Sequence, residues 1–393
     1  MKHLSTFLIA LLSFYIGIAQ VNSGLNNFKI KAVNDKVMMS GDDALLHLLV
    51  NPNPNTVAIS NAKSVNLNET VIGNTTYDLQ TNAAIQDRII MHNDGSISAA
   101  WTMSQQYNTT FADRGSGYNF YSYSNGAWDA NPNMRLESSR CGWPSMIVTG
   151  SGKEAVITHN TDNSYVGITH RASIGSGAWT ENIISSQDST GMFRDMIWNR
   201  SAVGGLNNET IHMIAVTASS NFAGLPFNGL DGALVYSRSQ DGGVTWLKQL
   251  GGANNNYYQY TDVDVTTNGT VYATISSNCT DKGIWRSSDG QNWVNITDSM
   301  FSPIYSRVVI GINPSNENQV YFLAAETDNY GQYTEVFFGG ETWTSFWKYE
   351  YISGDGTGNG GQWTDLSSNI PANQSTTFDN FNAQGSYNMV VSV

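Results

Sequence analysis

Two aspartates in this sequence stand at a spacing that could support chemistry. Asp262 and Asp264 are two residues apart in a segment that alternates polar and apolar residues, so their side chains share one face of a predicted strand. Two carboxyl groups on one face can act on a glycosidic bond or bind a cation. Solvated carboxylates on an ordinary strand face would give the same spacing, and the sequence alone favours this simpler interpretation.

Two further sets of polar residues have the composition of metal sites. His159 and His170 end two similar strand segments and would lie together if those strands pair in that register, but no third ligand is apparent. Asp355 and Asn359 lie in the glycine-rich segment 354–361, which fits a flexible loop or a calcium site. This segment opens no helix, so a dinucleotide site is not expected. We interpret the histidines as ordinary strand residues and predict no metal and no cofactor.

The composition excludes several classes of protein. Of the 393 residues, 40% are hydrophobic and 13% are charged, and the formal net charge is −13. This apolar content is enough for a sizeable core, which argues against general disorder. The negative charge and the scattered Lys and Arg residues argue against binding to nucleic acid or to anionic lipid. The sequence also lacks G-x-S-x-G, H-E-x-x-H, Walker and C-x-x-C motifs.

The N-terminus has the pattern of a secretory signal peptide. A short basic start precedes an apolar run and small residues at the cleavage position, so we predict a signal peptide over 1–19 and a leader segment over 20–65. No later segment is apolar enough to span a membrane. We therefore expect a protein that is secreted or held at the cell surface. There Cys141 and Cys279 could form a disulfide or remain two buried free thiols.

Alternating apolar residues predict many short strands. The clearest runs are 97–103, 211–215 and 271–275. Between such runs stand turn sequences whose residues adopt the positive φ of tight hairpins: Asn93-Asp94-Gly95, Asn125-Gly126, Asn268-Gly269 and Asp289-Gly290. Long amphipathic helices are not predicted. The pattern indicates an all-β protein, that is, a sandwich, a barrel or a propeller.

A repeated turn sequence favours the propeller. Residues 239–246 read S-x-D-x-G-x-T-W after a predicted strand, and residues 287–293 are a version that is one residue shorter. Weaker copies end at Trp128, Trp179 and Trp363. A hairpin unit that recurs every ~40–50 residues is typical of propeller blades.

The two motifs resemble the Asp box, or BNR repeat, of bacterial sialidases and sortilin-type propellers. The resemblance covers about residues 66–393 and implies an all-β propeller of four-stranded antiparallel blades. It gives the box a structural role, because the Asp carboxylate can accept N–H groups of the turn and the Trp packs into the blade. The residues with that implied role are Ser239, Asp241, Gly243, Thr245, Trp246, Ser287, Asp289, Gly290 and Trp293.

The start of this region is also similar to exported BNR proteins of Bacteroidetes. The similar segments are 76–82, 88–90 and 94–97. Many of those proteins leave through the type IX secretion system and end in a sorting domain. This sequence ends instead at 388–393, which is similar to the strand-like segment 307–312. We therefore expect about five to six blades in a propeller truncated at its C-terminus, with a natural end that closes the ring as the alternative.

The family resemblance also lets the sequence be compared with the residues that sialidases use for catalysis. Sialidases hold the substrate carboxylate with three arginines and use a Tyr nucleophile activated by a Glu, with an Asp as the acid/base. Arg88 stands in the place of the first of these arginines, but Ile90 replaces the proline of the motif and Asp87 replaces its aromatic residue. No Tyr–Glu pair stands out. The other candidate arginines are Arg140, Arg194, Arg200 and Arg307.

The interpretation that we prefer is a secreted or surface-attached propeller that binds glycans or extracellular proteins. Aromatic residues of its loops could stack on sugars, although packing within the blades explains the same pattern. The aromatic candidates are Tyr118, Phe120, Tyr121, Tyr123, Tyr257, Tyr258 and Tyr260. The alternatives are a sialidase-like exo-glycoside hydrolase and a purely structural module of a larger surface protein.

Overall fold

The computed structural model describes most of the chain beyond residue 68. The described residues are 69–77, 79–80, 87–107, 110–160, 165–184, 187–192, 195–220, 223–244, 247–253, 261–337, 340–371 and 389–393. Several predictions fall outside them, namely those for 1–19, 20–65, Arg194, Thr245, Trp246, Tyr257, Tyr258 and Tyr260. Residues 67–393 form one compact unit. No helix within the described part is long and apolar enough to cross a membrane.

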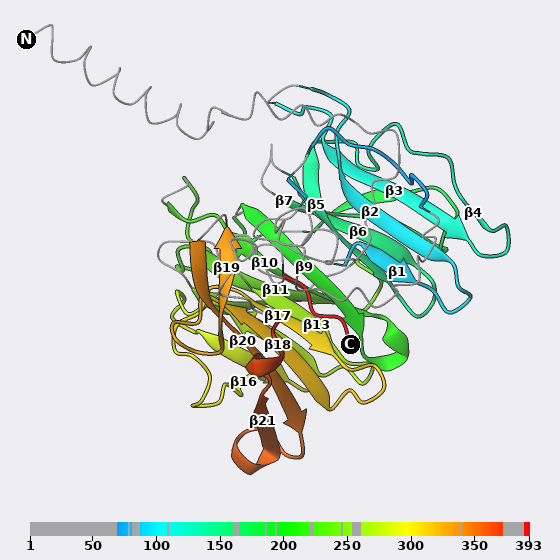
Figure 1. Cartoon of the computed structure of the whole chain (residues 1–393). Coiled ribbons are helices and arrows are strands. Elements are labelled where there is room, and N and C mark those ends of the chain that lie inside the picture. The colour runs from blue at the N-terminus through cyan, green and yellow to red at the C-terminus, as the bar shows by residue number, and fades with distance from the viewer. Residues whose placement is uncertain are drawn as a thin grey trace, which may run out of the picture. The chain divides into compact units, whose positions relative to one another are not determined.

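Five antiparallel sheets follow one another along the described residues, and we name them blades 1 to 5 (Figure 1). Blade 1 contains β1 (Ile89–Met91), β2 (Ile97–Met103), β3 (Gly115–Ser122) and β4 (Ala127–Trp128). Blade 2 contains β5 (Cys141–Val148), β6 (Glu154–Asn160), β7 (Tyr165–Arg171) and β8 (Thr180–Ile184). Blade 3 contains β9 (Met196–Gly204), β10 (Thr210–Thr217), β11 (Ala233–Ser239) and β12 (Leu247–Ala253).

Blades 4 and 5 continue the pattern, and blade 5 carries one additional strand. Blade 4 contains β13 (Asp262–Val265), β14 (Val271–Ile275), β15 (Gly283–Ser287) and β16 (Val294–Asn295). Blade 5 contains β17 (Val308–Ile312), β18 (Gln319–Ala325), β20 (Gly340–Tyr351) and β21 (Gly361–Asp365). The additional strand β19 (Gln332–Phe337) pairs with the first part of β20, and β21 pairs with its second part. The short 3-10 helices are Leu206–Asn208, Gly358–Gly360 and Ser367–Asn369.

The strands and hairpins follow the predicted alternation and turns. Alternate residues of β10 from Ile211 to Ala215 lie in one apolar cluster, and alternate residues of β14 lie in another. The predicted turns join β1 to β2, β3 to β4, β13 to β14 and β15 to β16, and their glycines all have positive φ. Glycine adopts this conformation without the steric cost of a Cβ atom. These predictions are confirmed.

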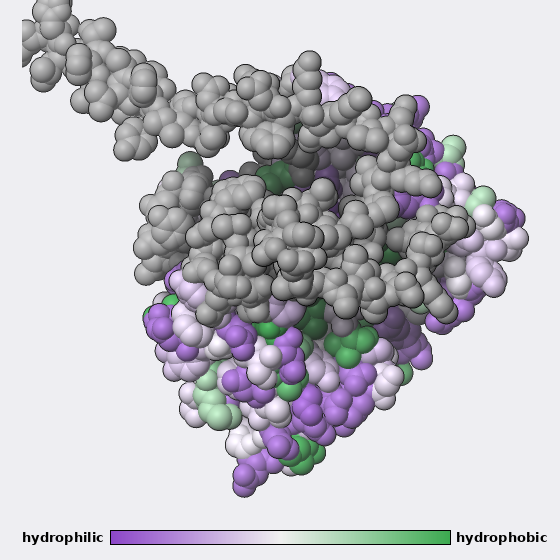
Figure 2. Space-filling model, in the orientation of Figure 1, coloured by the Kyte–Doolittle hydropathy of each residue, from purple (hydrophilic) through white to green (hydrophobic). Residues whose placement is uncertain are grey.

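Consecutive blades pack face to face, which makes the fold a β-propeller. One apolar cluster joins Ile168 of blade 2 to Met196 of blade 3, and another joins Ile284 of blade 4 to Phe322 of blade 5. The segment Met389–Val393, red in Figure 1, lies against β17. Figure 2 shows a surface on which hydrophilic and neutral residues alternate and apolar residues form small separate groups. The predicted fold class is confirmed.

The two Asp-box turns, Ser239-x-Asp241-x-Gly243 and the shorter Ser287-x-Asp289-Gly290, close the hairpins β11–β12 and β15–β16 with similar hydrogen bonds. Asp241 Oδ1 accepts hydrogen bonds from the N–H of Val244 at 3.1 Å and from the hydroxyl of Ser239 at 2.8 Å. Asp289 Oδ1 accepts from the N–H groups two and three residues further on, at 2.7 and 2.8 Å. These backbone bonds hold the pKa of Asp289 well below its usual range. Both carboxylates therefore stabilise turns.

The two cysteines are separate in the structure. Cys141 begins β5 in blade 2 and Cys279 follows β14 in blade 4, and both are buried free thiols. Burial raises the pKa of the Cys141 thiol and raises that of Cys279 to about 12. The disulfide that the sequence left open is therefore not formed here, and the alternative of two buried thiols describes the structure.

Candidate functional site

The first strands of the blades enclose a cavity of about 80 Å³, which we call the central cavity. Its polar lining consists of Asp87, just before β1, Ser201 in β9, and Asp262 and Asp264 in β13. The remaining lining residues are apolar: Val263, Val309, Ile310, Met389, Val390 and Val391. Carboxyl groups from blades 1 and 4 thus converge on one cavity.

Asp262 and Asp264 share one face of β13, as predicted, but the interpretation as an ordinary solvated face is wrong. Both are half-buried, because β17 and the segment Met389–Val391 lie beside them. Asp262 Oδ2 accepts a hydrogen bond from the N–H of Ile310 at 2.9 Å, and Asp264 Oδ1 accepts one from the N–H of Val265 at 2.8 Å.

The surroundings of the central cavity give these two carboxyl groups different pKa values. Burial raises the pKa of Asp262 to about 6 and that of Asp264 to about 8, and the negative charge of Asp87 adds to both effects. The hydrogen bond from the N–H of Ile310 and the charge of Arg200 oppose the rise at Asp262. Near pH 7, a largely protonated carboxyl group therefore stands two residues from a largely ionised one. Pairs of this kind are a feature of acid–base sites.

Sequence reasoning missed two members of the central cavity. Asp87 was named from the sequence only as a departure from the sialidase arginine motif, and Ser201 was not named. The Asp87 side chain is exposed toward the cavity, but protein surrounds it closely enough for burial to raise its pKa. The Ser201 hydroxyl lies 2.5 Å from the hydroxyl of Ser145 in β5. No local pattern distinguishes Ser201 from other strand serines.

The described candidate arginines are placed away from the lining of the central cavity. Arg88 is half-buried beside the central cavity, and its Nη1 donates to Gln80 Oε1 at 3.1 Å. Arg200 and Arg307 are each only 1% exposed. Arg140 Nε donates to a backbone carbonyl at 3.0 Å. None of these four is among the lining residues of the central cavity.

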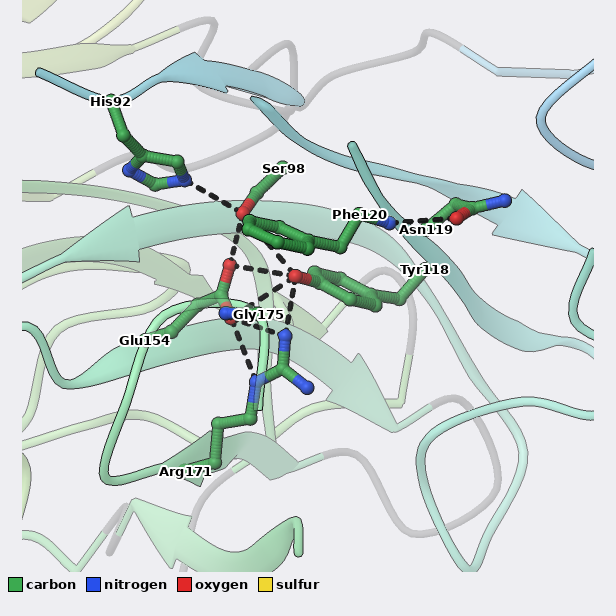
Figure 3. A network of polar contacts seen from close by, with 8 residues as sticks. All are labelled: His92, Ser98, Tyr118, Asn119, Phe120, Glu154, Arg171 and Gly175. Carbon is green, nitrogen blue, oxygen red and sulfur yellow. Dashed lines mark hydrogen bonds and ion pairs between the residues drawn. The ribbon is translucent and has the colours of Figure 1, made fainter. Parts of the chain in front are cut away.

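A Tyr–Glu pair does exist, but it lies in the seam between blades 1 and 2 (Figure 3). The Tyr118 hydroxyl is 3.0 Å from Oε1 of Glu154, and Arg171 Nε donates to Glu154 Oε2 at 2.8 Å. The guanidinium of Arg171 lies 4.6 Å from the ring centroid of Tyr118 and 4.4 Å from that of Trp179. Burial and the charge of Glu154 raise the pKa of Tyr118, whereas a nucleophile needs it lowered. We conclude that this buried network joins two blades.

The two histidines are not cross-strand neighbours, so the metal interpretation of this pair is wrong. His159 of β6 pairs with Val166 of β7, whereas His170 of β7 pairs with Ala155. His159 is buried, its Nδ1 accepts the N–H of Trp198 at 3.1 Å, and burial lowers its pKa to about 3. It is therefore a neutral core residue.

The calcium interpretation of the glycine-rich loop also lacks support. Asp355 Oδ1 accepts hydrogen bonds from the N–H and the hydroxyl of Thr357, at 3.0 and 2.7 Å, and so serves a local turn. Throughout the described residues, no group of three or more His, Cys, Asp or Glu side chains is placed to hold a metal ion.

The described aromatic candidates mostly pack within blade 1 or in its seam with blade 2. Tyr118 is buried, Phe120 is half-buried against the same apolar cluster, and Tyr121 lies 5.6 Å from Trp128 between ring centroids. Tyr123 alone among the described candidates is largely exposed, at 67%. Packing inside the protein, rather than sugar binding, therefore explains three of the four described aromatic candidates.

Comparisons with known proteins found likenesses among solved structures. A Hadza microbial sialidase has 11% sequence identity and a TM-score of 0.41, with 66% of this chain and 55% of that chain covered. A Dyadobacter fermentans protein of unknown function has 12% identity and a TM-score of 0.43, with 77% and 88% covered. A Trypanosoma rangeli sialidase in complex with 2,3-difluorosialic acid has 13% identity and a TM-score of 0.37, with 67% and 46% covered.

This chain spans about half the length of the two sialidases. No protein-family model matches the sequence. No curated protein matches it.

Proposed function

We propose that this propeller binds a glycan in its central cavity. The observation that carries the proposal is the convergence of Asp87, Asp262 and Asp264 on one cavity whose other walls are largely apolar. Carboxyl groups are strong acceptors for sugar hydroxyls, and apolar side chains fit the C–H faces of a sugar ring. The resemblance of the sequence to sialidase-type propellers supports a glycan as the ligand.

The charge of the central cavity favours a neutral sugar over an acidic one. An acidic sugar would bring its carboxylate next to Asp87 and Asp262, and like charges at short range repel. Arg200 and Arg307 are buried and do not line the cavity, so neither offers a bound sugar a direct contact there, although the charge of Arg200 acts on Asp262. We therefore propose a neutral glycan and rank an arginine-clamped acidic sugar below it.

Hydrolysis is the second candidate function, because the central cavity contains two carboxyl groups of different acidity. Asp264, with a pKa of about 8, would donate a proton to the leaving group, and Asp262, ionised above a pH of about 6, would act as the base or nucleophile. Binding needs only the acceptors of the cavity, so it is the simpler function for this geometry.

We further propose that the protein acts outside the cell, where free glycans or glycan-bearing surface proteins would be its partners. The pattern of residues 1–19 and the composition of the sequence support this location.

A glycan panel with matched variants tests the proposed function. The secreted full chain is titrated with neutral and acidic oligosaccharides by calorimetry, beside Asp262→Asn and the control Asp129→Asn, an exposed residue outside the central cavity. We expect a neutral glycan to bind, Asp262→Asn to weaken binding about tenfold, and the control to leave it unchanged. Preference for acidic glycans, or equal affinity of both variants, would contradict the proposal.

Hydrolysis is measured separately as the release of reducing sugar. If the protein is a hydrolase, Asp264→Asn should stop turnover while the variant still binds the glycan. Absence of turnover by the wild type leaves glycan binding as the function.

A further inference from the structure

A second cavity, of about 100 Å³, opens in the seam between blades 3 and 4, and we call it the seam slot. Its aromatic lining consists of Tyr236 of β11, Trp285 of β15 and Trp293 of the turn after β15. Its aliphatic lining consists of Ile214, Leu234, Ala273 and Ile275, and Asp281 contributes a carboxylate. We propose that the seam slot binds a quaternary ammonium group, such as that of choline.

The seam between blades 1 and 2 contains a Tyr–Trp pair like the one in the seam slot, which we call the first corner. There Tyr118 of β3 and Trp179 of the next blade pack edge to face, with ring centroids 5.1 Å apart and planes at 72°. In the seam slot Tyr236 and Trp293 repeat this arrangement, at 5.0 Å and 80°. The first corner holds the guanidinium of Arg171 over both rings. A cation over aromatic faces is therefore already part of this molecule.

The hairpin of blade 4 lacks the Glu–Arg ion pair that the corresponding hairpin of blade 2 contains. Glu154 begins β6 and pairs with Arg171, the last residue of β7. In blade 4, the residues at the same places in the hairpin are Val271, which begins β14, and Ser287, which ends β15. A valine and a serine thus stand where the first seam has its ion pair. The residues that line the seam slot include no Lys or Arg, so a cation held there would come from a ligand.

The polar groups that line the seam slot itself carry no positive charge. His212 Nδ1 lies 2.6 Å from the Tyr236 hydroxyl, and burial lowers the pKa of His212 to about 4, so this ring is neutral at pH 7. Arg238 is near Tyr236, but its Nη1 donates to the Asp289 carbonyl and it does not line the slot. Asp281 is exposed at the slot, and the whole chain is strongly acidic.

The nature of the lining selects the class of cation. A guanidinium or a primary ammonium needs hydrogen-bond acceptors, which Glu154 supplies in the first seam. The seam slot is mostly apolar and aromatic, and Asp281 is the only carboxylate among its lining residues. A quaternary ammonium donates no hydrogen bonds and is attracted to Trp and Tyr faces, so it fits this lining best.

The test compares choline with 3,3-dimethyl-1-butanol, its neutral isostere of nearly the same shape. The full chain is titrated with each, and indole fluorescence and NMR shifts are followed for wild type, Trp285→Ala and the control Trp128→Ala. Trp128 is another half-buried tryptophan, in blade 1. We expect choline to bind with Kd on the order of 1 mM, the isostere to bind at least about tenfold more weakly, and Trp285→Ala alone to reduce choline binding about tenfold.

A second variant keeps the test valid if Trp285→Ala does not fold. Asp281→Lys replaces the carboxylate at the exposed edge of the slot with a positive charge, so it should weaken choline binding at least about tenfold and leave the core unchanged. Equal binding of choline and its isostere would overturn the proposal. So would tighter binding of methylguanidinium than of tetramethylammonium, unchanged choline binding in Asp281→Lys, or no binding of choline at concentrations about a hundredfold above 1 mM.

Discussion

The buried ion pair between blades 1 and 2 makes a sharp prediction about stability. Glu154 is fully buried and contacts Arg171, Tyr118 and the backbone N–H of Gly175. Glu154→Gln keeps the size and the hydrogen-bonding oxygen of the side chain but leaves the buried guanidinium without its counter-charge. Removing one partner of a buried ion pair costs about 3–5 kcal/mol, so we expect Glu154→Gln to lower the free energy of unfolding by about this amount.

Urea unfolding at pH 7 measures this effect within a double-mutant cycle. Arg171→Met alone should also be strongly destabilising, whereas the double variant should lose far less than the sum of the two, because the remaining buried groups are neutral. The control is Glu350→Gln, which breaks the partly exposed pair with Lys348 at 3.5 Å and should cost less than about 1 kcal/mol. If Glu154→Gln costs no more than this control, our account of the seam is wrong.

Three further predictions concern single sites. Because the pKa of Asp264 is raised from 3.8 to about 8, its ionisation destabilises the fold increasingly as the pH rises from about 4 to 8. Asp264→Asn should therefore gain about 1–3 kcal/mol over wild type at pH 8 and little at pH 4, measured by urea unfolding at both values. Asp289→Ala should cost about 1 kcal/mol through the loss of its turn hydrogen bonds, while Asp129→Ala should be neutral in the same assay. Cys141 and Cys279 should resist iodoacetamide in the native protein and both react in urea without a reductant; a single disulfide would leave neither reactive.

The strands and hairpin turns could be predicted from the sequence because they depend on local patterns. Alternation in β10 and β14 reflects burial on one face, and the glycines of the turns adopt backbone conformations that few other residues tolerate. The two repeated Asp-box turns depend on hydrogen bonds within a few residues, such as those of Asp289. The shared face of Asp262 and Asp264 follows from the same periodicity.

The central cavity could not be predicted because it depends on which strands face one another across the ring. Asp87 and Asp264 are far apart in the sequence, and their convergence requires blades 1 and 4 to be placed first. The same reason applies to His159 and His170, whose separation depends on the register of β6 with β7. The Glu154–Arg171 pair and the seam slot likewise depend on packing between blades, which leaves no periodic signal in the sequence.

The most direct test of the central claim is to observe the carboxyl groups themselves. Carboxyl ¹³C shifts of Asp262 and Asp264 are recorded by NMR while the best neutral glycan of the panel is added, with Asp129 as the internal reference. We predict that glycan binding shifts the Asp262 and Asp264 signals and leaves Asp129 unchanged. A glycan that binds while both cavity signals stay in place would contradict the account.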